Sequence, residues 1–191
     1  MSTFKRNYET VMSEIDSVLS YVNSKEVENF ITLFEHIKKV NPTSKIVVAG
    51  AGRMGYAAKG FAMRLGHMGY NVWMLGDSTV PHIGEEDILV VASGSGNTQT
   101  IYDISKRAYD NGASICLITN NPDSRIGRLA SRVIRLPNGS NKDSDERSSQ
   151  QPMTTLNEQC LAILLDTIVL GIMNKTGETH DTMWNRHSNL E

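Results

Sequence analysis

Cysteine, basic charge and long apolar runs are all in short supply in this sequence, and each shortage excludes a class of protein. The two cysteines, Cys116 and Cys160, form no CxxC pair and no cluster with histidine at zinc spacing, so we expect two buried thiols and no metal site. A formal charge of −2 gives no electrostatic attraction for nucleic acid or an anionic membrane. The longest apolar stretch, residues 161–173, is too short for a bilayer and contains Asp166, and residues 1–6 lack the apolar core of a signal peptide. We therefore expect a cytoplasmic protein with neither a membrane nor a nucleic acid as partner.

Hydrophobic periodicity divides the 191 residues into helices and strands within one expected domain. Helical spacing is found at residues 7–21, 27–40, 54–68, 98–111 and 153–174, with a short helix at 124–130. Strand-like runs are found at residues 46–49, 71–75, 88–92, 114–119 and 132–136. The domain 1–191 then consists of N-terminal helices (1–40), a sheet core (45–136), a polar loop long enough for a lid (137–151), and C-terminal helices with a tail (152–191).

Strands that alternate with helices favour right-handed crossovers and a parallel sheet covered on both faces. We predict an α/β fold, a three-layer αβα sandwich around a five-stranded parallel sheet in the flavodoxin-like order 2-1-3-4-5, with extra N-terminal and C-terminal helices. In that order the winding reverses between the first and third strands, which is where such sheets bind ligands. The helix at 153–174 is apolar on most sides, more than a small sheet can cover, so we expect a homo-oligomer.

A loop rich in glycine and hydroxyl groups, residues 93–98 (SGSGNT), follows the third strand and opens a helix. Ser93, Ser95 and Thr98 supply hydroxyls, the glycines allow a ligand to approach the backbone, and a helix N-terminus favours an anion. The loop therefore predicts a site for a phosphate monoester. The structural alternative is a tight turn in which one of these residues caps the helix.

A second glycine-rich loop, residues 50–55 (GAGRMG), follows the first strand and matches the dinucleotide fingerprint. Asp77 lies near the position of a ribose-binding acid, so an NAD-binding or flavin oxidoreductase is an alternative function, although no second domain is evident to present a substrate. For an anionic sugar, Gly52 and Arg53 are the candidate contacts, with Arg53 as a second anchor for the anion.

Glu158 is the candidate catalytic carboxylate, because it begins an otherwise apolar helix. A carboxylate near a helix N-terminus stays ionised at neutral pH and is able to abstract a proton next to a carbonyl. The structural alternative is a capping box, in which Thr155 and Glu158 only tie off the helix start.

Two of the five histidines are candidates for proton transfer. His67 lies late in a helix between Gly66 and Gly69, and His187 lies in the tail next to aromatic and aliphatic residues able to dock on a neighbouring subunit. The structural alternative for His187 is a solvated chain end.

Taken together these motifs resemble the sugar isomerase family of phosphosugar-binding domains, over nearly the whole chain. The resemblance is carried by residues 50–55, 61–65, 93–98, 119–124, 151–153, 158–159 and 186–191. The QPM segment at 151–153 and the tail are the most specific of these. Departures from the subfamily pattern are Met54, Asn97, Thr155 and Ser188.

The resemblance implies a metal-independent isomerase without a cofactor. It would interconvert 3-hexulose 6-phosphate and fructose 6-phosphate, as in the ribulose monophosphate pathway of formaldehyde fixation, and assemble as a dimer or homotetramer. By similarity the phosphate ligands are Ser93, Ser95 and Thr98, with Ser149 as a weaker addition. Glu158 would be the base that forms a cis-enediol, and the proton shuttle between oxygens would be either His187, from a neighbouring subunit, or His67.

Two further functions fit the same sequence. One is a different aldose–ketose phosphosugar isomerase. The other is a non-catalytic sugar-phosphate sensor, which the absence of a basic recognition helix in the first 40 residues disfavours.

Overall fold

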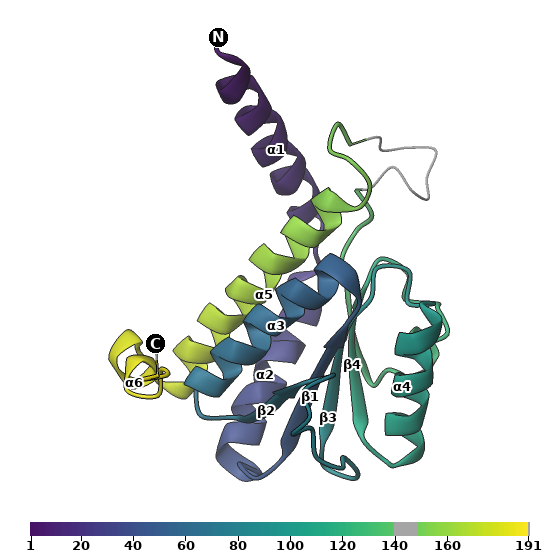
Figure 1. The fold of residues 1–191 in the computed structure, drawn as a ribbon, viewed down its shortest axis with the longest axis vertical. Coiled ribbons are helices and arrows are strands. Elements are labelled where there is room, and N and C mark those ends of the chain that lie inside the picture. Colours follow the sequence, from purple (N-terminus) through teal and green to yellow (C-terminus); the bar gives the residue numbers. More distant parts are fainter. Residues whose placement is uncertain (140–148, 191) are drawn as a thin grey trace.

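The computed structural model describes residues 1–139 and 149–190 and has a central sheet with helices on both sides (Figure 1). The strands are β1 (Lys45–Gly50), β2 (Asn71–Met74), β3 (Ile88–Ala92), β4 (Ser114–Thr119) and β5 (Arg132–Arg135). The helices are α1 (Thr3–Leu19), α2 (Ser24–Val40), α3 (Gly52–His67), α4 (Gln99–Asp110), α5 (Thr155–Thr176) and α6 (His180–Trp184), with a 3₁₀ turn η1 (Gly127–Leu129). The loop expected over 137–151 lies largely outside the described residues.

All five strands are parallel and their order is β2-β1-β3-β4-β5, as predicted. Alternate side chains of β1 point to opposite faces. Ile46 and Val48 join a core with α2, α3 and α5, whereas Val47 and Ala49 join a core with α4. Figure 1 shows α4 on one face of the sheet and α2, α3 and α5 on the other. The predicted three-layer α/β sandwich with extra terminal helices is confirmed.

Helix α5 is the central helix of the more heavily covered face. It packs against α3, α2 and α1, and its buried residues run from Leu156 to Ile172. The helix has 22 residues and is long and apolar enough to cross a membrane, which corrects the expectation from residues 161–173. Half of its most apolar window is buried inside the fold, as in the core helix of a globular protein. Ile163 and Leu170 remain exposed on its outer side.

Local hydrogen bonds explain where several helices begin and end. Helix α1 begins before residue 7 because the Ser2 side chain accepts the Lys5 N–H at 3.2 Å, and Asn23 caps α2 in the same way. The helix expected over 124–130 is reduced to the turn η1, because the backbone is already extended at Ala130 on the way into β5.

Gly55 allows α3 to pack closely on β1, and this gives a first prediction. A Cβ at Gly55 would lie 2.6 Å from the Gly50 carbonyl oxygen, whereas a Cβ at Gly60 on the same helix meets nothing within 4 Å. Gly55→Ala should therefore lower the free energy of unfolding by about 1–3 kcal/mol through overpacking. The control Gly60→Ala should raise it by about 0.5–1 kcal/mol through helix propensity. Urea denaturation measures both, and equal stabilities would contradict the close approach.

Candidate active site

The two glycine-rich loops lie side by side at the carboxyl end of the sheet. Gly50 of β1 and Ala92 of β3 are register partners, so the residues that follow them leave the sheet at adjacent points. The winding of the sheet reverses between these two strands. The structure therefore brings the loop 93–98 next to Gly52 and Arg53.

One polar group of the loop 93–98 has no hydrogen-bond partner within the described residues. Ser93 is 4% exposed, and its Oγ makes no hydrogen bond. The tight turn of the structural alternative is present, since the Gly96 N–H donates to the Ser93 carbonyl oxygen, and Thr98 is the N-cap residue of α4, but its side chain makes no capping bond. Ser95 is exposed, and its Oγ accepts the Asn97 N–H at 3.2 Å. The loop thus carries a buried hydroxyl without a partner and leads into the N-terminus of a 12-residue helix, two features that favour an anion.

The start of α3 supplies a second set of donors. Gly52 is its first residue and has a φ of +56°, a conformation that favours glycine even though the space around it is open. Ala51 at the N-cap makes no side-chain capping bond, so the first N–H groups of the helix have no side-chain acceptor there. Asp77, the candidate ribose ligand of the dinucleotide alternative, is exposed and lines a cavity of about 380 Å³ between α3 and β2.

Glu158 lies in the first turn of α5 and joins this site through Arg53. Its side chain is 11% exposed, its Oε2 lies 2.6 Å from Arg53 Nε, and its Oε1 accepts the Thr154 hydroxyl at 2.7 Å. The capping box of Thr155 and Glu158 is wrong, because the N-cap residue is Thr154 instead of Thr155 and its side chain makes no capping bond to the backbone. The buried Oε2 of Glu158 lies within ion-pair distance of Arg53, although it accepts no hydrogen bond among the described residues.

Ser149 is engaged elsewhere. Its hydroxyl donates to Glu14 Oε2 at 2.7 Å and accepts the Gln151 N–H at 2.9 Å. Its hydrogen-bonding groups therefore hold a turn against α1.

His67 and His187 lie at the other end of α3. Their ring centroids are 5.0 Å apart, Trp184 stacks on His187 at 5.1 Å, and all three line a cavity of about 540 Å³. Arg53 and His67 are separated by about 21 Å, since an α-helix rises 1.5 Å per residue. Neither histidine reaches a sugar phosphate held at Glu158 of the same chain.

The hydrogen bonds of these two histidines define different tautomers. Arg64 Nη1 lies 3.1 Å from His67 Nδ1, and because a guanidinium only donates, Nδ1 accepts and the neutral ring carries its proton on Nε2. His187 Nδ1 lies 3.0 Å from the Ser188 carbonyl oxygen, which only accepts, so Nδ1 carries the proton and Nε2 is the accepting nitrogen. In the neutral rings the accepting nitrogen is therefore Nε2 in His187 and Nδ1 in His67.

An ion-pair cluster holds the C-terminal segment that carries His187. The Glu178 side chain is 8% exposed and pairs with Lys38 at 3.1 Å and Arg186 at 2.8 Å, and Arg186 also donates to the His67 carbonyl oxygen at 3.0 Å. Burial alone raises the pKa of Glu178, but hydrogen bonds from Arg186, Thr182 and Lys38 outweigh it and lower the pKa to about 2.

This cluster predicts a pH-dependent stability. Because the pKa of Glu178 is below its ordinary value of 4.5, the stability it contributes is present above pH 4.5 and is lost as the pH falls toward 2. Glu178→Gln should unfold with a free energy about 1–3 kcal/mol smaller than wild type at pH 7. Urea unfolding across a pH series should show the difference shrinking below pH 4.5, whereas a constant difference would contradict the ionised cluster.

Both cysteines are buried free thiols, as predicted. Burial raises the pKa of Cys116 to about 12 and that of Cys160 to about 11. Both stay protonated at neutral pH, so neither is an activated nucleophile.

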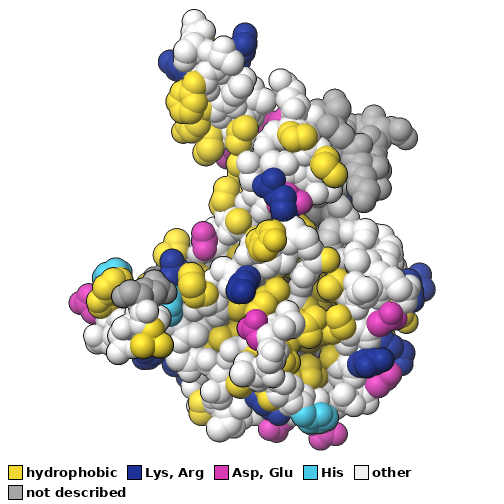
Figure 2. Space-filling model, viewed as in Figure 1, with side chains coloured by type: hydrophobic (Ala, Val, Ile, Leu, Met, Phe, Trp, Pro, Cys, Tyr) yellow, Lys and Arg dark blue, Asp and Glu magenta, His cyan; other side chains and the backbone are white. Residues whose placement is uncertain are grey.

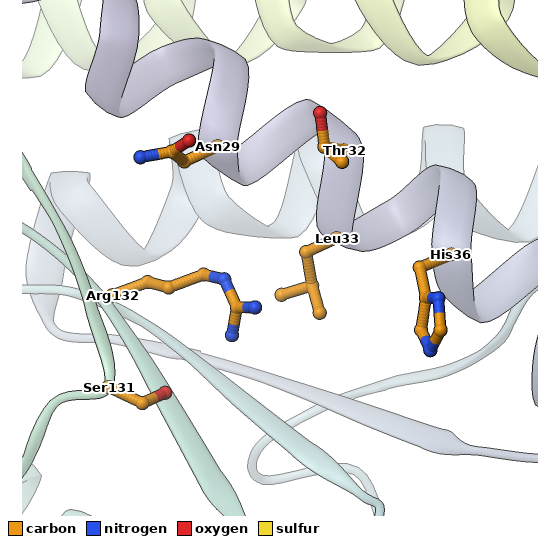
Figure 3. Close-up of a pocket in the computed structure, with 6 residues that line it drawn as sticks. All are labelled: Asn29, Thr32, Leu33, His36, Ser131 and Arg132. Atoms are coloured by element: carbon orange, nitrogen blue, oxygen red, sulfur yellow. The ribbon is translucent and has the colours of Figure 1, made fainter.

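A separate cavity of about 590 Å³ between α2 and β5 contains none of the predicted site residues. Figure 3 shows that Leu33 lies between the Arg132 guanidinium and His36, and that the Thr32 hydroxyl points away from Arg132. Its polar groups do not converge on one point.

Two polar residues near Glu158 were given no role by the sequence. Thr154 contacts the Glu158 carboxylate, and finding this contact required knowing where α5 begins. Gln159 has a buried Oε1 without a hydrogen-bond partner among the described residues. The sequence feature that could have identified it is a polar side chain in an otherwise apolar helix.

Comparison with known proteins identifies the family. The SIS domain model matches residues 39–169, which include the whole sheet and most of α5. A 3-hexulose-6-phosphate isomerase of Bacillus subtilis (strain 168) is 37% identical over 183 residues, 95% of each chain. The 3-hexulose-6-phosphate isomerase of Mycobacterium gastri is 36% identical over 154 residues, 81% of this chain and 77% of that one.

A solved structure agrees with these relatives. A Methanococcus jannaschii protein, whose crystal structure led to an inferred function of 3-hexulose-6-phosphate isomerase, superposes with a TM-score of 0.79 at 27% identity, over 97% of this chain and 99% of that one. With a family match across the sheet and a relative above 30% identity over nearly its whole length, this chain belongs to the SIS domain family.

Proposed function

We propose that this protein is a 3-hexulose-6-phosphate isomerase, which interconverts 3-hexulose 6-phosphate and fructose 6-phosphate through a cis-enediol. The observation that carries the proposal is the Glu158 carboxylate, whose buried Oε2 accepts no hydrogen bond among the described residues and is paired with Arg53, which follows β1 at the end of the sheet where Ser93 follows β3. The relatives of the same name support the substrate.

The reaction begins with the phosphate bound at the loop 93–98, by Ser93, Ser95, Thr98 and the N-terminus of α4. The C6 oxygen is esterified, so the 3-keto sugar cannot close a five-membered ring onto C3 and is met in its open-chain form. The fixed phosphate holds the C2–C3 unit against the base. Gly52 and Arg53, at the start of α3, supply further contacts to the anionic sugar.

Glu158 then removes the C2 proton of the 3-keto sugar, and the electron pair of that C–H bond forms the C2=C3 bond of the enediol. A proton returned at C3, with another moved from the C2 oxygen to the C3 oxygen, gives fructose 6-phosphate. Proton transfer by one positioned group is typically worth about 10²–10⁴-fold in rate. No metal ion or redox cofactor takes part in these steps.

The oxygen-to-oxygen proton transfer is assigned to His187 of a neighbouring subunit. Its Nε2 is the accepting nitrogen, whereas His67 carries its proton on Nε2 and receives Arg64 at Nδ1. The separation of about 21 Å along α3 requires a second chain to bring it to the substrate.

A homo-oligomer, a dimer or tetramer, is part of the proposal. Figure 2 shows apolar side chains along α1 and over the face formed by α3 and α5. The exposed large apolar residues of these helices are Phe4, Tyr8, Met12, Tyr56, Met63, Ile163 and Leu170. Such a surface is typical of subunit contacts. We place the protein in the cytoplasm, in the ribulose monophosphate pathway.

Incubation of the purified protein with fructose 6-phosphate tests the function. NMR should show 3-hexulose 6-phosphate appearing, and the rate should survive exhaustive chelation. Conversion of an aldose phosphate instead would identify a different phosphosugar isomerase. Binding without any conversion would identify a sensor, and absorbance changes with nicotinamide cofactors would identify an oxidoreductase.

A further inference from the structure

Glu14 of α1 binds the segment that leads into α5. Its carboxylate accepts three hydrogen bonds, from Ser149 Oγ at 2.7 Å, from the Gln150 N–H at 2.7 Å and from Gln151 Nε2 at 3.0 Å. Burial alone raises the pKa of Glu14, but these hydrogen bonds lower it overall, which shows that they favour the ionised form. One carboxylate thus fixes three consecutive residues.

The anchored turn is separated from Glu158 by a short, constrained stretch. Gln151 is followed by Pro152 and by Met153, which has a φ of +56°, an unfavourable conformation for a residue with a side chain. The next residue, Thr154, caps α5 and donates its hydroxyl to the Glu158 carboxylate. A shift of the turn would therefore be transmitted directly to Thr154 and to the position of the carboxylate.

The hydrogen bonds of Glu14 are not what attaches α1 to the protein. Ile15 and Val18 are buried in the main core and hold the helix there. The other end of the same loop is held independently, because the buried Asn157 side chain accepts the Gly139 N–H at 3.0 Å. Loss of the Glu14 carboxylate should thus loosen one segment without undocking a helix.

We propose that Glu14 is a positioning residue for the base Glu158, acting through the turn 149–151 and Thr154. The proposal rests on the proposed function, and it gives a physical role to the QPM segment at 151–153. Ser149 takes part in this positioning contact, since its hydroxyl donates a hydrogen bond to Glu14 Oε2.

The test compares Glu14→Gln with Glu9→Gln, an identical change at an exposed residue of the same helix. A carboxamide has one acceptor oxygen where the carboxylate has two, and its NH₂ group cannot accept a hydrogen bond. The turn 149–151 therefore loses hydrogen bonds to α1. We expect kcat to fall about 10- to 100-fold, as for a displaced catalytic group. KM, the affinity for inorganic phosphate and the melting temperature should stay close to wild type, and Glu9→Gln should change nothing.

Exchange of the two side chains separates positioning from a loss of stability. In the double variant Glu14→Gln with Gln151→Glu, the carboxamide at position 14 donates to the carboxylate at position 151 and keeps one acceptor oxygen for the Gln150 N–H, so part of the lost kcat should return. Amide hydrogen exchange at residues 150–158 should be faster in Glu14→Gln than in wild type, and slower in the double variant than in Glu14→Gln.

The outcomes distinguish the two proposals. An inactive wild-type protein would overturn the proposed function, while faster exchange in Glu14→Gln would still report the loosened segment. An active wild type with an equally active Glu14→Gln would overturn the positioning role alone. A loss of kcat matched by a lower melting temperature and weaker phosphate binding would also overturn it, in favour of a general structural role.

Discussion

Replacement of Glu158 by Gln should lower kcat by about 10²–10⁴-fold, the range typical of a lost general base. The carboxamide keeps the size of the side chain and still accepts the Thr154 hydroxyl, which donates to Oε1 at 2.7 Å. KM should change little, because the proposed phosphate site is the loop 93–98 and not Glu158. Steady-state kinetics with fructose 6-phosphate and thermal unfolding measure both effects.

The control for this variant is Glu9→Gln, the same exchange at an exposed position. A near-normal kcat in Glu158→Gln would show that Glu158 only supports the start of α5. A loss of kcat together with unfolding would leave the base unassigned, so Arg53→Met provides a second check. It leaves the carboxylate in place and should raise KM by removing the neighbouring cation.

The second large effect is expected at Ser93, where function and stability should change in opposite directions. Its Oγ is buried without a hydrogen-bond partner among the described residues, which costs stability in the absence of ligand. Ser93→Ala removes that buried hydroxyl and should leave the melting temperature unchanged or higher. It also removes a contact to the phosphate, so KM should rise about 10-fold, the value of one hydrogen bond to a charged group.

Ser95→Ala is the companion variant, because the Ser95 hydroxyl is exposed and only accepts the Asn97 N–H. It should raise KM without the gain in stability. If Ser93→Ala binds substrate as wild type does, the loop 93–98 is not the phosphate site.

The fold followed from local patterns because the sheet is buried on both faces. Uninterrupted β-branched runs give strands whose ends are set by the residues that leave the sheet, and the predicted bounds of β3 and β4 match those observed. The order of the strands followed from interpreting the alternation of strands and helices as a flavodoxin-like doubly wound sheet. Helix starts were less predictable, since Ser2 and Asn23 cap α1 and α2 through single hydrogen bonds.

The candidate site was predictable only in part. The loops were visible as motifs, and their adjacency follows from the pairing of β1 with β3. The bond from Thr154 to Glu158, the anchoring of Ser149 by Glu14 and the distance from His67 to Arg53 depend on how helices far apart in the sequence are placed. No spacing rule contains that information, because tertiary packing decides it.

The central claim is that Glu158 exchanges a sugar carbon proton with solvent through an enediol, and deuterium incorporation tests it most directly. Wild-type protein incubated with fructose 6-phosphate in deuterated water should place deuterium at C3 of fructose 6-phosphate while 3-hexulose 6-phosphate forms, and Glu158→Gln should do neither at a measurable rate. Formation of the 3-ketose while the remaining fructose 6-phosphate keeps its C3 proton through many turnovers, or full exchange in Glu158→Gln, would contradict the account.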